Sequence, residues 1–312
     1  MLFTIMLDLQ HESPKTICPT KPIHVARLYS LVIVGVTMTI LHKDRLLDHC
    51  EHTDLDKCLI LLINLDRASE RLQKMQTRLA DIGLDFERIR AVDGRGLKYP
   101  HPLFSAASYR FLHGRRWSPA EVGCYLSHLK AAEHLLKSDA KFALILEDDV
   151  VFSLDFIAHL RLAMDRSDLW DILRLSTVNS ARAIPIVQLN ETAQIGIALT
   201  REKGAGAYVI NRRAAAWIVR QIPIRVAYDI AFDLEYLSGL KAAFLIPQPC
   251  CQQTEEVSQI QNGIQALKLS RWRYMTVLPY RAWLEVSRLV LRGVRLLVVL
   301  ANETWRHLTG YR

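Results

Sequence analysis

Three adjacent carboxylates, Glu147, Asp148 and Asp149, directly follow the apolar residues Leu144–Leu146. Repulsion among neighbouring carboxylates raises at least one of their pKa values unless a cation is present. In proteins Mg²⁺ or Mn²⁺ is commonly held by one or two such oxygens together with phosphates of a substrate. The triplet is therefore a candidate metal site, although a solvated turn after a buried strand explains three acids equally well when they are taken alone.

The expected strand geometry divides the three acids. Because successive side chains of an extended segment point to opposite faces, Glu147 and Asp149 are expected on one side and Asp148 on the other. Glu147 and Asp149 then form the natural ligand pair, while Asp148 faces a loop or a helix cap. Whether Asp148 shares in binding a cation or only shapes the turn stays open.

A regular alternation of strand and helix patterns surrounds the acids. The run CLILLINLD, which begins at Cys58, and the run KFALIL before the acids have the pattern of strands buried on both faces. The first run is followed by apolar residues at helical spacing up to Gly83 and then by a second strand pattern, FERIRAV. This order predicts an α/β domain whose mostly parallel sheet is flanked by helices. Ligands of such open sheets bind beyond the carboxyl ends of the strands, so the acids are expected to face a crevice.

The helix after residue 117 has the clearest start in the chain. Ser118 suits the N-cap, Pro119 the first helical position and Glu121 the partner of a capping box. We expect this helix to run to about Lys137. The remaining pattern predicts strands over 171–175 and 206–211, a helix over 212–222 and a late strand that begins at residue 242.

Two segments flank the α/β pattern, which occupies residues 56–270. Residues 1–55 form an N-terminal extension of uncertain status, in which the apolar run from Leu28 to Leu41 holds 14 residues. A membrane-spanning helix needs roughly 20 apolar residues. A signal or anchor segment, a core element and an upstream extension from a misplaced start therefore all stay open for the run. Residues 271–312 form the second flanking segment, a basic tail.

The tail carries most of the excess positive charge. The whole chain has a formal net charge of +8, and residues 271–312 hold eight arginines against two glutamates. A near-neutral body does not suggest a nucleic-acid reader, whereas a basic tail suits an anionic surface. The six cysteines form no CxxC pair, and this favours a reduced, cytosolic setting.

The tail also has helical periodicity with two distinct faces. Its arginines at 281, 288, 292 and 295 share one narrow face. The broad opposite face holds Val286, Leu289, Val290, Leu296, Leu297 and Leu300. Such a basic amphipathic helix either lies in the headgroup layer of an anionic membrane or packs on the sheet with its arginine face in water.

An ordered series of motifs over roughly residues 58–260 resembles glycosyltransferase family 25, the family of bacterial lipooligosaccharide and lipopolysaccharide glycosyltransferases. Its members include β-galactosyltransferases, and collagen galactosyltransferases are distant relatives. The motifs are INLDR from Ile63 with Glu70-Arg71, AVDG from Ala91, SPAEVGCYLSH from Ser118, LILEDDV from Leu144, DILRL from Asp171, GAGAYVI from Gly204 and VAYD from Val226. The order of the motifs is more specific than any one of them.

The resemblance implies a fold of the GT-A type, a nucleotide-sugar donor and inversion at the anomeric carbon. It makes Glu147, Asp148 and Asp149 the counterpart of the family's acidic metal motif, with Asp149 the best ligand candidate for Mn²⁺ or Mg²⁺. A divalent ion suits this reaction because it neutralises the charge that develops on a departing nucleoside diphosphate.

Several further residues are candidates for binding the nucleotide or the sugar. Each also has a structural interpretation: Asp66 as a helix cap, Arg71 as a solvated charge, Asp93 as part of an Asp-Gly turn, His128 as a satisfied core residue and the Gly204-x-Gly206 pattern as an ordinary flexible loop. The candidates are Asn64, Asp66, Arg67, Arg71, Asp93, Ser127, His128, Gly204 and Gly206.

Direct displacement also needs a base for the acceptor hydroxyl. Asp229 matches the family's aspartate and is the first choice, with Asp233 and Glu235 as competitors. Ala227-Tyr228 precede Asp229 where the family usually has Pro-Val.

The predicted activity is transfer of a hexose, galactose from UDP-galactose, to a lipopolysaccharide or lipooligosaccharide acceptor. We expect the protein on the cytoplasmic side, peripheral to the inner face of the membrane, without a nucleic-acid partner. One alternative is a catalytically silent protein that binds a nucleotide sugar or a glycan on the same fold. A metal-dependent phosphohydrolase is the other, and it would need further acids or histidines around Glu147 and Asp149.

Overall fold

The computed structural model describes residues 54–178, 183–252 and 271–309. The chain divides into two units, Met1–His52 and Thr53–Arg312, and only the second is considered below. The apolar run at residues 28–41 lies outside the described residues. Within the described ranges no helix combines the length and the apolarity needed to cross a membrane.

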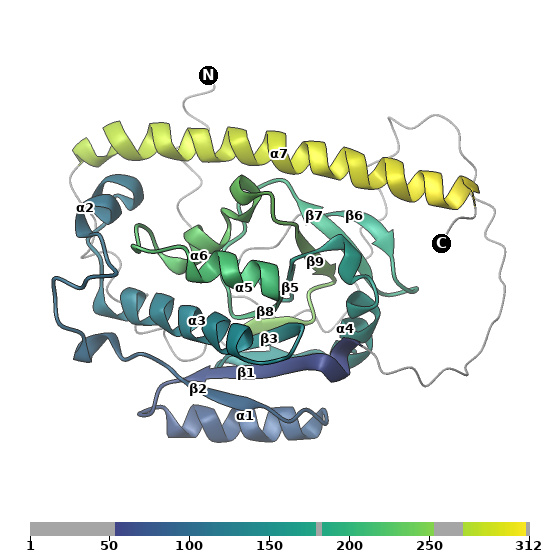
Figure 1. The fold of residues 1–312 in the computed structure, drawn as a ribbon, viewed down its shortest axis with the longest axis horizontal. Helices are drawn as coiled ribbons and strands as arrows, with labels where there is room; N and C mark the ends of the chain where they lie inside the picture. The colour runs from purple at the N-terminus through teal and green to yellow at the C-terminus, as the bar shows by residue number, and fades with distance from the viewer. Residues whose placement is uncertain (1–53, 179–182, 253–270, 310–312) are drawn as a thin grey trace. The chain divides into compact units, whose positions relative to one another are not determined.

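A mixed eight-stranded sheet with the order β2-β1-β3-β8-β5-β9-β7-β6 forms the centre of the second unit (Figure 1). Its strands are β1 Cys58–Asn64, β2 Glu87–Arg90, β3 Phe142–Glu147, β5 Ile172–Arg174, β6 Ala183–Gln188, β7 Gln194–Ala198, β8 Ala207–Asn211 and β9 Ala242–Ile246. Only β8 and β7 run against their neighbours, so six of these eight strands share one direction. The predicted α/β class with a mostly parallel sheet is confirmed.

The central strands are apolar throughout because both faces of the sheet are covered. Along β3, Ala143 and Ile145 belong to one buried cluster. Leu144 and Leu146 belong to a second buried cluster on the other face. Alternation of side chains along the strand therefore requires an apolar residue at every position.

The sheet is flanked by helices whose starts follow local rules. α3, which begins at Pro119, has the complete capping box between Ser118 and Glu121 that the sequence predicted. The helix expected over 212–222 ends earlier, at Val219. The main helices are α1 Ser69–Asp81, α3 Pro119–Lys137, α4 Phe156–Met164, α5 Arg212–Val219, α6 Tyr228–Phe232 and α7 Tyr274–Thr309. Shorter ones are α2 Ala106–Ser108, η1 Asp54–Lys57, η2 Gly94–Gly96, η3 Tyr109–His113, η4 Ser167–Leu169, η5 Glu235–Ser238 and η7 Arg271–Arg273.

A small second sheet places a late segment of the chain beside the acidic residues 147–149. β4, Val150–Phe152, pairs antiparallel with β10, Cys250–Gln252, and Gln252 lies opposite Val150 in the register. Gln252 is thereby placed beside the residues that follow β3. Sequence separation alone gave no sign of this contact.

The tail forms the single long helix α7, which runs along η3, η5, β7 and β6 (Figure 1). The sequence suggested that the arginines of this helix face either lipid headgroups or water. Both orientations are wrong for Arg288 and Arg292, because their side chains are only 1% and 3% exposed. They face inward, where they form ion pairs with the buried carboxylates of Asp233 and Glu235. The apolar face points outward instead, apart from Leu296, which is buried.

Candidate active site at the end of strand β3

Glu147 and Asp149 share one hydrogen-bond donor. The side-chain amide of Gln252 donates to Glu147 Oε2 at 2.7 Å and to Asp149 Oδ1 at 3.3 Å. The main chain of Glu147 is also fixed, since its N–H donates to the carbonyl of Gly206 at 2.8 Å. The two acids are therefore held toward a common point by residues from β10 and the loop before β8.

Asp148 has a different set of partners. Asn64 Nδ2 donates to Asp148 Oδ2 at 2.7 Å, and Arg71 Nη1 lies 3.0 Å from Asp148 Oδ1. Arg71 also reaches Asp149, with 3.2 Å between Nη2 and Oδ2. Asn64 and Arg71, expected at the nucleotide, thus bind the acidic triplet itself. Asp148 links the end of β1 to the end of β3.

The charge on the acids is only partly balanced. Burial, followed by the negative charge of Glu147, raises the pKa of Asp149 to about 7, and Arg71 offsets only part of this rise. Burial also raises the pKa of Asp148. A divalent cation between the oxygens of Glu147 and Asp149 would remove the repulsion that raises the pKa of Asp149. This charge and the all-oxygen donors fit Mn²⁺ or Mg²⁺.

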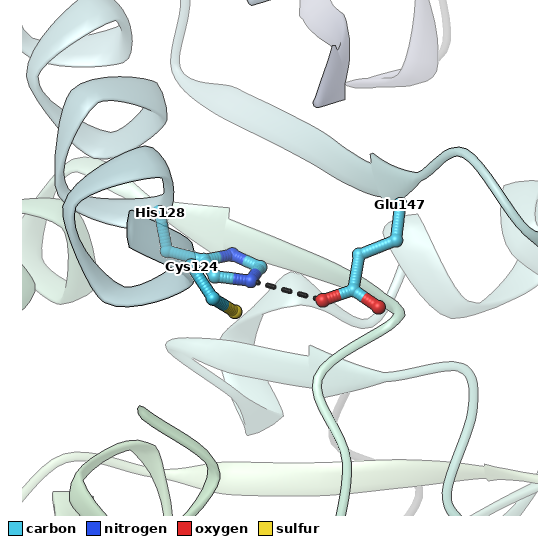
Figure 2. Close-up of side chains that lie close together, drawn as sticks. All are labelled: Cys124, His128 and Glu147. Carbon is cyan, nitrogen blue, oxygen red and sulfur yellow. Dashed lines mark hydrogen bonds and ion pairs between the residues drawn. The ribbon is translucent and has the colours of Figure 1, made fainter. Parts of the chain in front are cut away.

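His128 joins Glu147 to the helix α3 (Figure 2). Its Nε2 lies 3.2 Å from Glu147 Oε1, and its Nδ1 lies 2.9 Å from the hydroxyl of Tyr208. The ring stacks on Tyr228 with 4.0 Å between centroids. The sequence suggested His128 as a site residue, but neither tyrosine was identified, because both are brought in by long-range packing.

Cys124 completes a mixed group of possible metal donors. Ligand atoms of Cys124, His128 and Glu147 lie within 4.8 Å of one another (Figure 2). Such a set suits zinc better than a harder ion. Burial and the negative charge of Glu147 raise the pKa of the Cys124 thiol well above its usual value. Without a bound metal the thiol is therefore protonated, and for Mn²⁺ or Mg²⁺ the carboxylates are the better donors.

Three more predicted nucleotide residues lie on the surface near the carboxyl ends of β1 and β2. Asp66 Oδ1 pairs with Arg88 at 2.8 Å, and Asp93 Oδ2 pairs with Arg67 at 3.2 Å. Asp66 does not cap α1, because the cap residue is Ala68 and no side chain accepts a bond there. Its suggested structural role is wrong, and the carboxylate stays exposed beside the site.

Ser127 does not face the site. Its Oγ accepts a hydrogen bond from the N–H of Val92 at 2.8 Å and donates to the carbonyl of Gly123 at 2.7 Å. The hydroxyl is buried and fully used in holding α3 against the segment before Asp93. The prediction that Ser127 binds substrate directly is therefore wrong. The residue positions Asp93 instead.

The two candidate bases have opposite environments. Asp229, at the start of α6, is 34% exposed and lies 3.3 Å from Arg201. Asp233 is 0% exposed and lies within ion-pair distance of three arginines at 174, 288 and 292. Asp233 as a catalytic base is therefore wrong, because no acceptor reaches it. Glu235 is buried against Arg292 in the same way.

Asp229 adjoins the acidic cluster through its neighbour in the chain. Tyr228 stacks on His128, and His128 contacts Glu147. The negative charges of Glu147 and Asp229 both raise the pKa of the Cys124 thiol.

The family profile described as "Glycosyltransferase family 25 (LPS biosynthesis protein)" matches residues 58–232. The chain belongs to glycosyltransferase family 25. The motifs quoted from the sequence indicated the same family. The matched range contains the acidic triplet, His128 and Asp229, but ends before Gln252 and α7.

Relatives of this family 25 chain include animal proteins. A glycosyltransferase 25 family member from Drosophila pseudoobscura is 37% identical over 116 residues, which are 35% of this chain and 18% of the relative. Procollagen galactosyltransferase 2 from Homo sapiens is 27% identical over 144 residues, which are 41% of this chain and 23% of the relative. The chain thus matches less than a quarter of the length of either relative.

Two solved structures are similar to the family 25 chain in outline. The protein A197 from STIV has a TM-score of 0.36 and 13% identity over 64% of this chain and 97% of its own. The galactosyltransferase LgtC, solved with donor and acceptor sugar analogues, has a TM-score of 0.34 and 13% identity over 69% of this chain and 98% of its own. Because both TM-scores are low, the α/β fold class is assigned from the order of the strands and not from similarity to either structure.

The close contact between Gly206 and Gln252 gives a test of how the acids of this family 25 chain are held. A Cβ added to Gly206 would lie 2.7 Å from Gln252 Nε2. The change Gly206→Ala is therefore expected to displace the amide and to weaken Mn²⁺ binding about 10- to 100-fold, the usual cost of disturbing groups that orient ligands. Isothermal titration with Mn²⁺ measures the effect.

Two variants accompany Gly206→Ala. Gly293→Ala adds the same methyl group where nothing lies within 4 Å, and it should leave Mn²⁺ affinity unchanged. Gln252→Ala should weaken Mn²⁺ binding by itself, and adding Gly206→Ala to it should cost little more. Additive losses in the double variant would show that Gly206 does not act through Gln252.

Proposed function

We propose that the chain transfers a hexose, galactose from UDP-galactose, to a lipopolysaccharide or lipooligosaccharide acceptor by an inverting displacement. The observation that carries the proposal is the half-buried pair Glu147 and Asp149, held by one amide donor in a family 25 domain, with the pKa of Asp149 raised to about 7. The name of the human relative supports galactose, and the description of the family supports the acceptor.

Different residues of the site have different proposed roles. Glu147 and Asp149 would hold Mn²⁺ or Mg²⁺, which supplies positive charge for the diphosphate of the departing nucleotide. Arg71 adds a fixed positive charge beside the acids. The exposed groups near the ends of β1 and β2, Asp66, Arg67 and Asp93, would contact the base and ribose of the donor. The side chains of Val178 and Gln252 fill the space beside Gly204 and Gly206, so neither glycine is proposed to receive the sugar.

Asp229 is the proposed base for the acceptor hydroxyl. Its partial exposure lets an acceptor reach the carboxylate, and Arg201 holds one of its oxygens. The acceptor itself is a glycolipid in the proposal. The proposal therefore includes peripheral attachment of the protein to the cytoplasmic face of a membrane.

A donor panel tests the proposed activity. Purified protein is incubated with UDP-galactose, UDP-glucose and Mn²⁺, with a lipooligosaccharide core or a procollagen peptide as acceptor, and UDP release is followed. Release that depends on UDP-galactose and on the core supports the proposal. UDP release only with the procollagen peptide would refute the proposed glycolipid acceptor. Binding of UDP without turnover would favour the silent alternative, and hydrolysis of simple phosphate esters would favour a phosphohydrolase.

The change Asp229→Asn tests the base. It is expected to lower kcat about 10²- to 10⁴-fold, the range for loss of a general base, while UDP-galactose still binds. Steady-state kinetics and calorimetric titration of the donor separate the two effects. Arg201→Gln removes only the ion-pair partner and should cost far less. An unchanged kcat in Asp229→Asn would assign the base to another group.

A further inference from the structure

The outward face of α7 is continuously apolar over its middle portion. Between Val286 and Ala301 every residue classed as exposed is apolar. Leu289 and Leu297 are 57% and 68% exposed. The other exposed residues in this stretch are Val290, Leu291, Val294, Val298 and Leu300. Within the described part of the chain these exposed side chains all belong to α7, whose course along the domain is drawn in Figure 1.

The orientation of this face is fixed by the opposite side of the helix. Arg292 binds Glu235 at 2.7 Å and Asp233 at 3.0 Å, and Arg288 binds Asp233 at 2.9 Å. Arg295 Nη2 donates to the carbonyl of Leu169 at 2.7 Å. Rolling the helix inward would leave buried carboxylates without their cations, which is strongly unfavourable. The apolar face is therefore permanently turned outward.

Exposed aromatic and basic side chains also lie near both ends of α7, beyond the apolar stretch. Trp272 is exposed at the N-terminal end, next to the exposed Arg271, and Trp305 is exposed at the C-terminal end, next to the exposed Arg306. Thr276 donates a hydrogen bond to the carbonyl of Phe111, so the exposed ring of Phe111 adjoins the N-terminal end. Tryptophan and arginine in such places are typical of contact with lipid headgroups.

We propose that the outward face of α7 is a lipid-binding surface that lies in the headgroup and acyl boundary of an anionic bilayer. The exposed Arg271 and Arg306 near the ends of α7 complement such a surface. The face is also wider than the seam between two paired helices, since the consecutive residues Leu289, Val290 and Leu291 are all exposed. A broad apolar face suits insertion into lipid better than pairing with a second copy.

This inference rests on the proposed function in one respect, because a glycolipid acceptor gives the protein a reason to reside at a bilayer. The proposed lipid contact differs from a purely electrostatic attachment to the bilayer. The inward arginines, Arg288 and Arg292, cannot contact headgroups, so apolar insertion supplies most of the binding and the exposed arginines at the ends add a smaller part.

Co-sedimentation of the full chain with vesicles tests the surface. Phosphatidylcholine vesicles are compared with vesicles that also contain phosphatidylglycerol. We expect binding to both, tighter to the anionic vesicles. The double variant Leu289→Asp/Leu297→Asp should bind at least about tenfold more weakly. Leu154→Asp, which charges a fully exposed leucine on the loop after β4, is the matched control and should bind like the wild type.

Several results would overturn the inference. They are absence of vesicle binding by the wild type, equal binding by the double variant and equal loss in Leu154→Asp. A wild-type dimer that the double variant converts to monomer, without vesicle binding by either, would assign the face to a second copy. The transferase activity is measured in a separate assay, as UDP release with a soluble acceptor. Loss of that activity with intact vesicle binding would refute the proposed function and leave the lipid surface standing.

Discussion

Asp149→Asn is expected to lower kcat/KM for UDP-sugar turnover about 10³-fold, because a metal ion contributes several kcal/mol of charge stabilisation and each 1.36 kcal/mol is worth about tenfold. Asparagine keeps the shape of the side chain and its contact with Gln252 but lacks the negative charge. Mn²⁺ affinity, measured by calorimetry without any substrate, should fall in parallel with the activity.

The stability of the variant separates loss of a ligand from loss of structure. Burial and Glu147 raise the pKa of Asp149 to about 7, above its value in the unfolded chain. The wild type therefore loses stability as the pH rises from about 4 through about 7, and the loss is complete above that pH. Without metal, Asp149→Asn should then melt no lower than the wild type in mildly alkaline buffer, and Mn²⁺ should stabilise only the wild type.

A matched substitution guards this interpretation. Asp139→Asn makes the same chemical change at an exposed turn after α3 and should alter neither Mn²⁺ affinity nor turnover. If Asp149→Asn kept the Mn²⁺ affinity of the wild type, the cation would have to be held elsewhere, and the group of Cys124, His128 and Glu147 would be the first alternative. Cys124→Ser would then weaken binding.

The parts of the fold that local sequence rules determine were predictable. The strand β3 is apolar because both faces of the sheet are covered, and α3 starts at Pro119 because Ser118 and Glu121 satisfy its first N–H groups. The reversed strand β8 was not predictable, since direction depends on how a strand pairs rather than on its composition. Gln252 was missed for the same reason, because only the pairing of β10 with β4 brings it to Glu147.

The tail shows a different limit of sequence reasoning. Helical periodicity separated the arginine face of α7 from its apolar face, but it did not say which of the two faces the domain. That choice was made by Asp233 and Glu235, whose buried charges require cations. Both acids were placed among the candidate bases because an acid near a motif resembles a catalytic group. Burial, which the sequence does not display, decides between the roles.

Asp233→Asn is expected to lower the free energy of unfolding by about 3–5 kcal/mol, the usual cost of removing one partner from a buried ion pair. The change removes the carboxylate partner of Arg174 and the buried partner of Arg288, which keeps only the exposed Glu285. For a domain of this size the loss corresponds to a fall in Tm on the order of 10 °C. Urea and thermal unfolding, followed by circular dichroism, measure it.

Glu285→Gln provides the control, because Glu285 pairs with the same Arg288 at 2.8 Å but is 52% exposed. An exposed ion pair contributes only about 0–1 kcal/mol, so its loss should hardly change the Tm. Asp229→Asn should likewise keep the Tm while kcat falls. The opposite pattern at residue 233, an unchanged Tm together with a lost kcat, would mean that the carboxylate acts in catalysis. Because Arg288 and Arg292 also hold α7 in place, destabilisation by Asp233→Asn should loosen α7 first and expose it to limited proteolysis.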